Sequence, residues 1–174
     1  MIKRLFSLAI ISTVLLSASC AQQKKATGNN TTTKATTNSS TKTANDITSV
    51  TMERTSCFGR CPAYKTEIFS DGTVKYTSRS FTKYEGVYTS TIKTKEVSKL
   101  FAEMAAYQID TCSAEYESLI ADVPGIIFHI MRGEKDQEIM NAHFGPSYLK
   151  SLAKRIDELA TPNEKWKKIS DIKN

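Results

Sequence analysis

The chain has 174 residues, of which 40% are hydrophobic and 24% are charged, and its formal net charge is +6. Two of the 24 basic residues lie in positions 1–19, and four lie in positions 20–46 beside one acidic residue. Positions 47–174 therefore hold 18 basic and 17 acidic residues, a net charge of +1. A domain so close to neutrality lacks the basic surface that nucleic-acid binding needs, so we expect no nucleic-acid partner.

The N-terminus has the organisation of a signal peptide. Two basic residues precede an apolar run at 5–16, and small residues occupy 17–19. The run is shorter than the roughly 20 residues of a membrane span, so 1–19 is predicted to be a cleaved signal peptide. The "LSASC" that ends at Cys20 resembles the lipobox of bacterial lipoproteins, although Leu16 lies four residues before the cysteine instead of three. We predict that Cys20 is the lipid anchor; the alternative is ordinary secretion with Cys20 as a spare thiol.

The segment that follows Cys20 is predicted to be a disordered tether. Residues 21–46 consist mainly of Thr, Asn, Ser, Lys and Ala, with no large apolar side chain, so they cannot bury enough surface to offset the entropy of ordering. A flexible coil of this length has an end-to-end distance of about 30 Å. With a lipid at Cys20, the chain is expected in a bacterial cell envelope. The non-acidic "AQQKK" after the cysteine favours the outer membrane, facing the periplasm.

The first half of the remaining chain predicts strands followed by a helix. "SVTMERT" at 49–55 partly alternates and is predicted to be an edge strand. Asp71-Gly72 lies between two alternating runs and predicts a hairpin over 63–78. A further strand is expected at 84–92. A helix then begins with Thr94 as its cap and carries one apolar face, formed by Val97, Leu100, Phe101 and Met104.

The second half predicts a hairpin and a last helix. Residues 110–123 are the least regular, with a short helical turn expected around 115–120. A buried strand over 126–131 is followed by a partner strand in "QEIMNAHF", across a turn centred near Glu134. Pro146 opens the last helix, because its missing N–H is not needed there. The apolar face of this helix is formed by Leu149, Leu152, Ile156 and Leu159.

This order of elements predicts the α+β class: an antiparallel sheet of five or six strands with two helices packed on one face. We expect one domain over 47–160 and a tail over 161–174, with Trp166 holding the tail to the body.

"SCFGRCPAY" at 56–64 carries the most distinctive chemistry. In an exported protein, Cys57 and Cys61 are expected to form a structural disulfide. An extended five-residue span would hold their Cα atoms too far apart, so the loop must turn, and Gly59 can supply a positive φ. Pro62 then directs the chain into a strand. So small a loop adds only about 2 kcal/mol in the chain-entropy model.

Two other interpretations of the loop stay open. A redox site normally has Cys-x-x-Cys at a helix N-terminus, whereas three residues separate these cysteines and a strand follows. A metal site would need further ligands, from Cys112, His129 or His143. In the expected register, Ile139 or Met140 lies opposite His129, so the two histidines are about 10 Å apart and do not form a ligand pair.

Cys112 has no obvious partner. It is a buried free thiol, a partner for Cys57 or Cys61, or a link between two molecules. No catalytic motif accompanies it. A nucleophile elbow, a phosphate loop, a zinc-protease motif and a dinucleotide fingerprint are all missing from the sequence, and Asp122, Asp157 and Glu158 show no catalytic spacing. We therefore expect no cofactor, no metal and no catalysis.

"CFGRCPAYKTEIFSDGTVKY" resembles the signature of an uncharacterised domain family of bacterial exported proteins and lipoproteins, in which Cys-x-Gly-x-Cys-Pro-x-Tyr precedes an Asp-Gly-Thr hairpin. "DVPG" at 122–125 and "IDEL" at 156–159 extend the resemblance. It implies one compact domain with no established activity. The motif positions are Cys57, Gly59, Cys61, Pro62, Tyr64, Asp71 and Gly72.

Together these features predict a membrane-anchored envelope lipoprotein whose domain binds an envelope protein or a glycan without catalysis. The alternative is an envelope thiol-redox or metal-binding protein that uses the Cys57/Cys61 loop. A weaker third hypothesis is a hydrolase whose site is built from scattered acidic residues.

Overall fold

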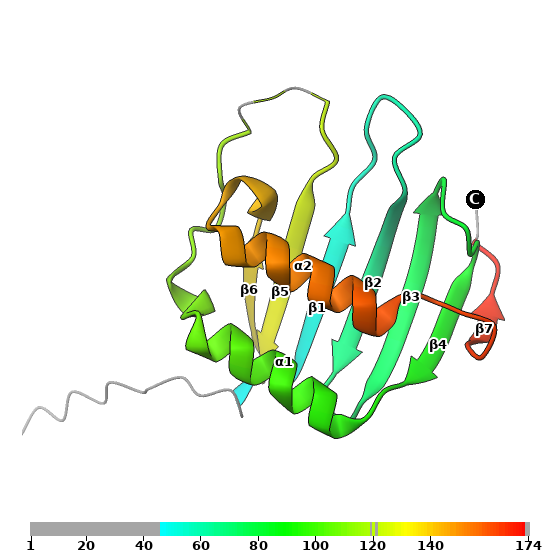
Figure 1. The fold of residues 1–174 in the computed structure, drawn as a ribbon, viewed down its shortest axis with the longest axis horizontal. Coiled ribbons are helices and arrows are strands. Elements are labelled where there is room, and N and C mark those ends of the chain that lie inside the picture. Colours follow the sequence, from blue (N-terminus) through cyan, green and yellow to red (C-terminus); the bar gives the residue numbers. More distant parts are fainter. Residues whose placement is uncertain (1–45, 119, 121, 173–174) are drawn as a thin grey trace, which may run out of the picture. The chain divides into compact units, whose positions relative to one another are not determined.

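The computed structural model describes residues 46–118, 120 and 122–172, so the predictions for the signal peptide, Cys20 and the tether up to residue 45 lie outside the described residues. The described chain forms one antiparallel sheet in the order β6-β5-β1-β2-β3-β4-β7 (Figure 1). The strands are β1 (Ser49–Arg54), β2 (Ala63–Phe69), β3 (Thr73–Ser80), β4 (Val87–Thr91), β5 (Ile126–Arg132), β6 (Lys135–Ile139) and β7 (Lys167–Ser170). The helices are α1 (Thr94–Ala106) and α2 (Ser147–Ala160), with short 3-10 turns η2 (Ile109–Thr111) and η3 (Ala142–Phe144).

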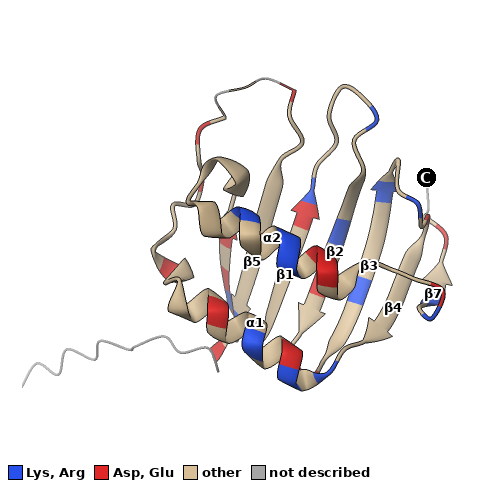
Figure 2. Cartoon of the chain, viewed as in Figure 1, with Lys and Arg blue, Asp and Glu red and all other residues tan. Residues whose placement is uncertain are grey.

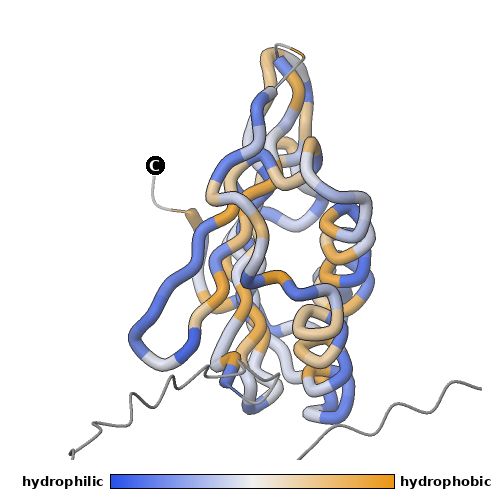
Figure 3. Tube along the Cα trace, turned by 90° about the vertical axis from the view of Figure 1, so that its left-hand side faces the viewer, coloured by the Kyte–Doolittle hydropathy of each residue, from blue (hydrophilic) through white to orange (hydrophobic). Residues whose placement is uncertain are grey.

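The predicted α+β class is confirmed, and both helices lie on the same side of the sheet (Figures 1 and 3). The expected number of five or six strands is wrong, because the sheet has seven. The strand that raises the number is β7, which pairs antiparallel with β4. All four of its residues are exposed, so its sequence lacks the alternation of a half-buried strand.

The β2–β3 hairpin lies where the Asp-Gly pair predicts it. Asp71 Oδ1 accepts a hydrogen bond from the Thr73 N–H at 2.8 Å. Gly72 has φ +91°, and a Cβ there would lie 2.5 Å from the Ile92 carbonyl oxygen. Glycine is therefore required both by the turn and by the close approach of the chain that leads into α1.

β1 is an interior strand, not the predicted edge strand. It pairs with β2 on one side and with β5 on the other. Val50 and Met52 are completely buried beneath the helices. The partner β5 comes more than 70 residues later in the chain, so local alternation could not reveal the second neighbour.

The β5–β6 hairpin has a different register from the expected one. The strands pair Arg132 with Lys135, so Glu138 lies opposite His129 in place of Ile139 or Met140. β6 ends at Ile139, and His143 lies in η3 and not in a strand. A tight turn with Gly133 at φ +59° accounts for the shift.

The helices bury the faces that their periodicity predicts. On α1 these are Val97, Leu100, Phe101 and Met104, and on α2 they include Leu149, Leu152 and Ile156. The caps differ from the expectation: Lys93 is the N-cap of α1, so Thr94 is already inside the helix, and Pro146 is the N-cap of α2.

The irregular segment before β5 contains η2. The expected helical turn is not found in the described part of 115–120, where Glu115 forms a parallel bridge with Met140. A backbone bridge to the edge of the sheet replaces local helical bonds in this segment.

Candidate functional site

The β1–β2 connection is a short loop closed by a disulfide. Cys57 and Cys61 are bonded, with their Cα atoms 5.7 Å apart. Gly59 does not adopt the positive φ that we expected. Its N–H instead donates to Cys57 Sγ at 3.2 Å, so the loop turns through a local backbone-to-sulfur contact.

The tip of this loop presents an aromatic and a cationic side chain to solvent. Phe58 is 91% exposed, and Arg60 is also exposed. Phe58 therefore contributes almost no buried area to the fold. Aromatic and arginine side chains are also the types that contribute most to protein interfaces. The tip is therefore a candidate contact surface.

Gly125, immediately before β5, holds the base of the loop on one side. The Thr55 N–H donates to the Gly125 carbonyl at 3.1 Å, and the Gly125 N–H donates to Thr55 Oγ1 at 2.7 Å. A Cβ at position 125 would lie 3.0 Å from that hydroxyl oxygen, so glycine permits the approach. Asp122, with φ +63°, lines a shallow hollow with Cys57 and Phe58.

A polar triad holds the other side of the base. Arg54 and Tyr64 are cross-strand partners on β1 and β2, and Asp157 reaches them from α2. Arg54 donates from Nε to the Tyr64 hydroxyl at 2.9 Å and from a terminal nitrogen to Asp157 Oδ2 at 2.6 Å. The Tyr64 hydroxyl donates to Asp157 Oδ1 at 2.6 Å. The three groups thus satisfy one another and link the loop to α2.

The electrostatics of the triad favour the protonated phenol and the charged guanidinium. Burial, together with the hydrogen bond to Asp157, raises the pKa of Tyr64 well above its ordinary value. Burial alone would lower the pKa of Arg54, but its bonds to Asp157 and Tyr64 reverse that effect and raise the pKa. Neither group is prepared to transfer a proton near neutral pH, so the triad is suited to support.

The structure brings together three segments of the sequence resemblance that are distant along the chain. They are the cysteine loop with Tyr64, "DVPG" through Gly125, and "IDEL" through Asp157. Pro62 precedes β2 at the same end. Asp71 and Gly72 are not part of this group, because they form the β2–β3 turn at the opposite end of β2 (Figure 1).

His143 was expected in the last strand, but it lies in η3. Its ring packs against the Phe144 ring at a tilt of 44°, with centroids 4.1 Å apart. Both ring nitrogens are shielded from solvent, and neither has a hydrogen-bond partner among the described residues. Burial, and secondarily the cations Lys150 and Arg54, lowers the pKa of His143. Only the position of η3 against α2 creates this environment, and no local sequence signal indicates it.

Because Cys57 and Cys61 are bonded to each other, neither is paired with Cys112. Among the described cysteines, Cys112 is a half-buried free thiol. Its sulfur lies in hydrogen-bond contact with the Tyr148 hydroxyl on α2. His129 lies on β5 beside Asp136 and Glu138. Within the part of the chain that is described, no three His, Cys, Asp or Glu side chains are grouped as metal ligands would be.

Charges of both signs are interspersed over the strands and helices (Figure 2), in agreement with the near-neutral balance of residues 47–174. Across the described ranges, no helix is both long and apolar enough to cross a membrane.

The family model of a domain of unknown function, DUF6438, matches residues 48–160. The chain belongs to this family. The DUF6438 region contains β1 to β6 and both helices, and β7 lies beyond it. No curated protein matches the chain.

Proposed function

We propose that this chain is a membrane-anchored lipoprotein of the bacterial cell envelope, and that its DUF6438 domain binds an envelope protein or a glycan without catalysis. The observation that carries the binding role is the exposed Phe58 on a covalently closed loop whose base is fixed on both sides. A contact residue on a rigid support loses little conformational entropy when it binds.

Within the domain, the disulfide loop lies at the far end of β1 from Asp46. Asp46 lies three residues before the start of β1, and the disulfide loop follows the other end of that strand. The six residues of β1 separate the two points by about 20 Å.

Anchoring is tested by mass spectrometry of the mature N-terminus and by membrane fractionation. We expect a diacylglyceryl-modified Cys20 as the first residue, and we expect Cys20→Ser to leave the membrane fraction. An unmodified N-terminus at another position would refute the lipoprotein assignment.

Binding is tested by placing a photo-crosslinking amino acid at position 58 in cells and, separately, at the control position 154. Lys154 lies on α2 with its side chain 81% exposed, so the control is equally accessible. We expect a discrete crosslinked envelope protein, or retention on isolated cell-wall glycan, only from position 58, and we expect Arg60→Ala to weaken it. Equal products from both positions, or turnover of a cell-wall, peptide or glycan substrate by the purified protein, would contradict the proposal.

A further inference from the structure

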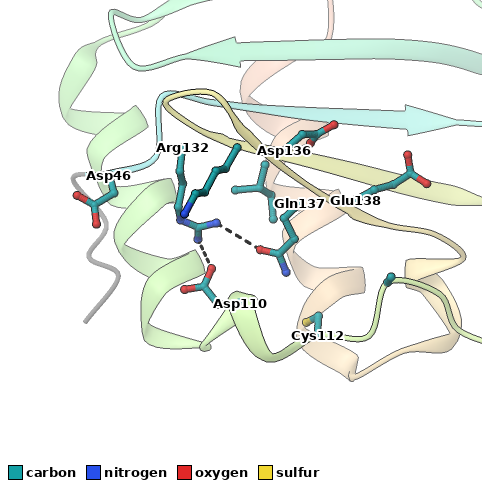
Figure 4. A pocket seen from close by; sticks show the side chains of 10 residues that line it. Asp46, Asp110, Cys112, Arg132, Asp136, Gln137 and Glu138 are labelled. Carbon is teal, nitrogen blue, oxygen red and sulfur yellow. Dashed lines mark hydrogen bonds and ion pairs between the residues drawn. The ribbon is translucent and has the colours of Figure 1, made fainter. Parts of the chain in front are cut away.

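A second surface lies beside the edge strand β6. An open pocket of about 690 Å³ separates β6 from the segment that follows α1 (Figure 4). Asp110, Cys112 and Ala114 line one side of it, and Arg132 and Gln137 line the other.

Side chains hold the two walls apart. Arg132, whose side chain is only 9% exposed, pairs with Asp110 at 2.5 Å. Gln137 accepts a bond from Arg132 at 3.3 Å and donates to the Ile109 carbonyl at 2.9 Å. The pocket is therefore spanned by side-chain bridges from the sheet to η2, and the backbone of 109–114 does not pair with β6.

Among the described residues, no strand pairs with the outer edge of β6 directly beside the pocket. Just beyond the strand, the Met140 N–H donates to the Ala114 carbonyl at 2.7 Å, and the Tyr116 N–H donates to the Met140 carbonyl at 3.2 Å. Backbone groups on a strand alternate in direction, so those of Asp136 and Glu138 point outward as Met140 does. Among the described residues, Lys135–Ile139 pairs with no strand other than β5.

The charges along this edge favour a basic ligand. The pocket is lined by four acidic residues and two basic residues, a net charge of −2. Asp136 and Glu138 project on the face of β6 opposite Gln137 (Figure 4), and both lie beside the one side chain of His129, at 3.0 and 3.7 Å. A strand added at the edge would place every second side chain next to these carboxylates, where opposite charges pair favourably.

We propose that the groove beside β6 binds an extended segment of a partner protein by strand addition, with Lys or Arg at every second position facing Asp136 and Glu138. The intervening side chains enter the pocket next to Cys112 and Ala114. Unpaired edge groups supply main-chain hydrogen bonds, and the alternating charges set the register. This site is independent of the disulfide-loop surface.

The test uses fluorescence anisotropy of labelled peptides with the purified full chain in detergent. The probe is the peptide Lys-Thr-Lys-Ala-Lys-Thr-Lys-Ala, and its control has the same composition with the four lysines clustered at one end. We expect saturable binding of the alternating peptide at least tenfold tighter than that of the control, and weaker binding as salt is added. Absence of saturable binding, or equal binding of both peptides, would overturn the proposal.

Four variants locate the site. Glu138→Lys is expected to weaken binding about tenfold, whereas Glu134→Lys makes the same charge change in the adjacent exposed turn and should alter it less than twofold. Glu138→Pro removes an outward N–H and should bind more weakly than Glu138→Gln, which removes only the charge. Equal effects of Glu134→Lys and Glu138→Lys, or of Glu138→Pro and Glu138→Gln, would contradict strand addition here.

The chain's own lysine-bearing segment before Asp46 is the competing occupant. A variant that combines Lys24→Ser, Lys25→Ser, Lys34→Ser and Lys42→Ser should bind the alternating peptide as the parent does. If the peptide bound only to this variant, the groove would belong to the chain's own N-terminal segment, and the assignment to a partner would be wrong. Phe58→Ala should leave peptide binding unchanged, so failure of this site and failure of the loop-tip proposal are distinguishable.

Discussion

Tyr64 places its hydroxyl between Arg54 and Asp157, where it both accepts and donates a hydrogen bond. Tyr64→Phe removes both bonds and leaves the charged pair in place. Hydrogen bonds to charged groups contribute about 1.5–3 kcal/mol when buried, so at this half-buried site we expect a loss of about 1–2 kcal/mol in unfolding free energy. Urea unfolding followed through the single tryptophan, Trp166, measures it.

Tyr84→Phe is the matched control for Tyr64→Phe. Tyr84 is half-buried, and its hydroxyl takes part in no hydrogen bond in the described structure. We expect this variant to unfold within about 0.5 kcal/mol of the parent. A similar loss in both variants would mean that the triad contributes nothing specific.

The disulfide has a local role at the residue scale. Replacing Cys57 and Cys61 together with Ser should lower the unfolding free energy by about 2 kcal/mol while the fold remains, because the closed loop is short. In the parent, alkylation under denaturing conditions should modify Cys112 alone among these three cysteines before reduction, and all three afterwards. Loss of disulfide exchange or metal binding in the double variant, with stability unchanged, would favour the thiol or metal alternative.

His143 gives the stability a defined pH dependence. Its pKa is lowered in the folded state from the ordinary value of 6.5, so the unfolded chain binds more protons between the two values. The contribution of His143 to the free energy of unfolding is therefore fully present above about pH 6.5, and it is lost as the pH falls through the pKa of the folded state. His143→Phe, which retains a ring against Phe144, should show a flatter dependence between pH 7.5 and 5. An unchanged slope would contradict this origin.

At the scale of elements, β7 depends on Gly86, the residue immediately before its neighbour β4. Gly86 has φ +119°, and a Cβ there would lie 2.6 Å from both the Ser170 carbonyl oxygen and Lys168 Cε. Gly133 has φ +59°, with nothing within 4 Å of the same position. Ala at either site costs backbone strain, but only Gly86→Ala also forces β7 away.

We therefore expect Gly86→Ala to unfold about 1–2 kcal/mol more easily than Gly133→Ala. Hydrogen exchange should show that the amides of β4 and β7 become less protected in Gly86→Ala alone. Equal losses of stability and protection in the two variants would show that the contact with β7 is unimportant.

Elements with a strong local pattern were predictable from the sequence. The Asp71-Gly72 hairpin and the buried faces of α1 and α2 follow from residues within one or two turns of each other. β7 and the interior position of β1 were not predictable in the same way. Exposed Lys167–Ser170 carries no periodicity, and the second neighbour of β1 is set by pairing with a distant strand.

For the whole molecule, the cysteine loop was recognisable from its composition, but its supports were not. Thr55, Arg54 and Asp157 become part of the site only because β5 and α2 return to the end of β1 and β2. Likewise, the groove beside β6 exists because the chain after η2 forms backbone hydrogen bonds with the sheet edge at Met140. Next to β6 itself, side chains such as Arg132 and Asp110 bridge the gap.

The helix faces and the central hairpin follow from the sequence alone, because each depends on spacing between near neighbours, and the order of these elements indicates the α+β class. The structure was needed to choose the Cys57–Cys61 bridge among the pairings that the sequence left open. Only the tertiary structure decided the strand order, the β5–β6 register, the environment of His143 and the two candidate surfaces. These features depend on contacts between residues tens of positions apart. Forming such contacts costs loop-closure entropy, which burial of the whole core offsets and no local pattern can.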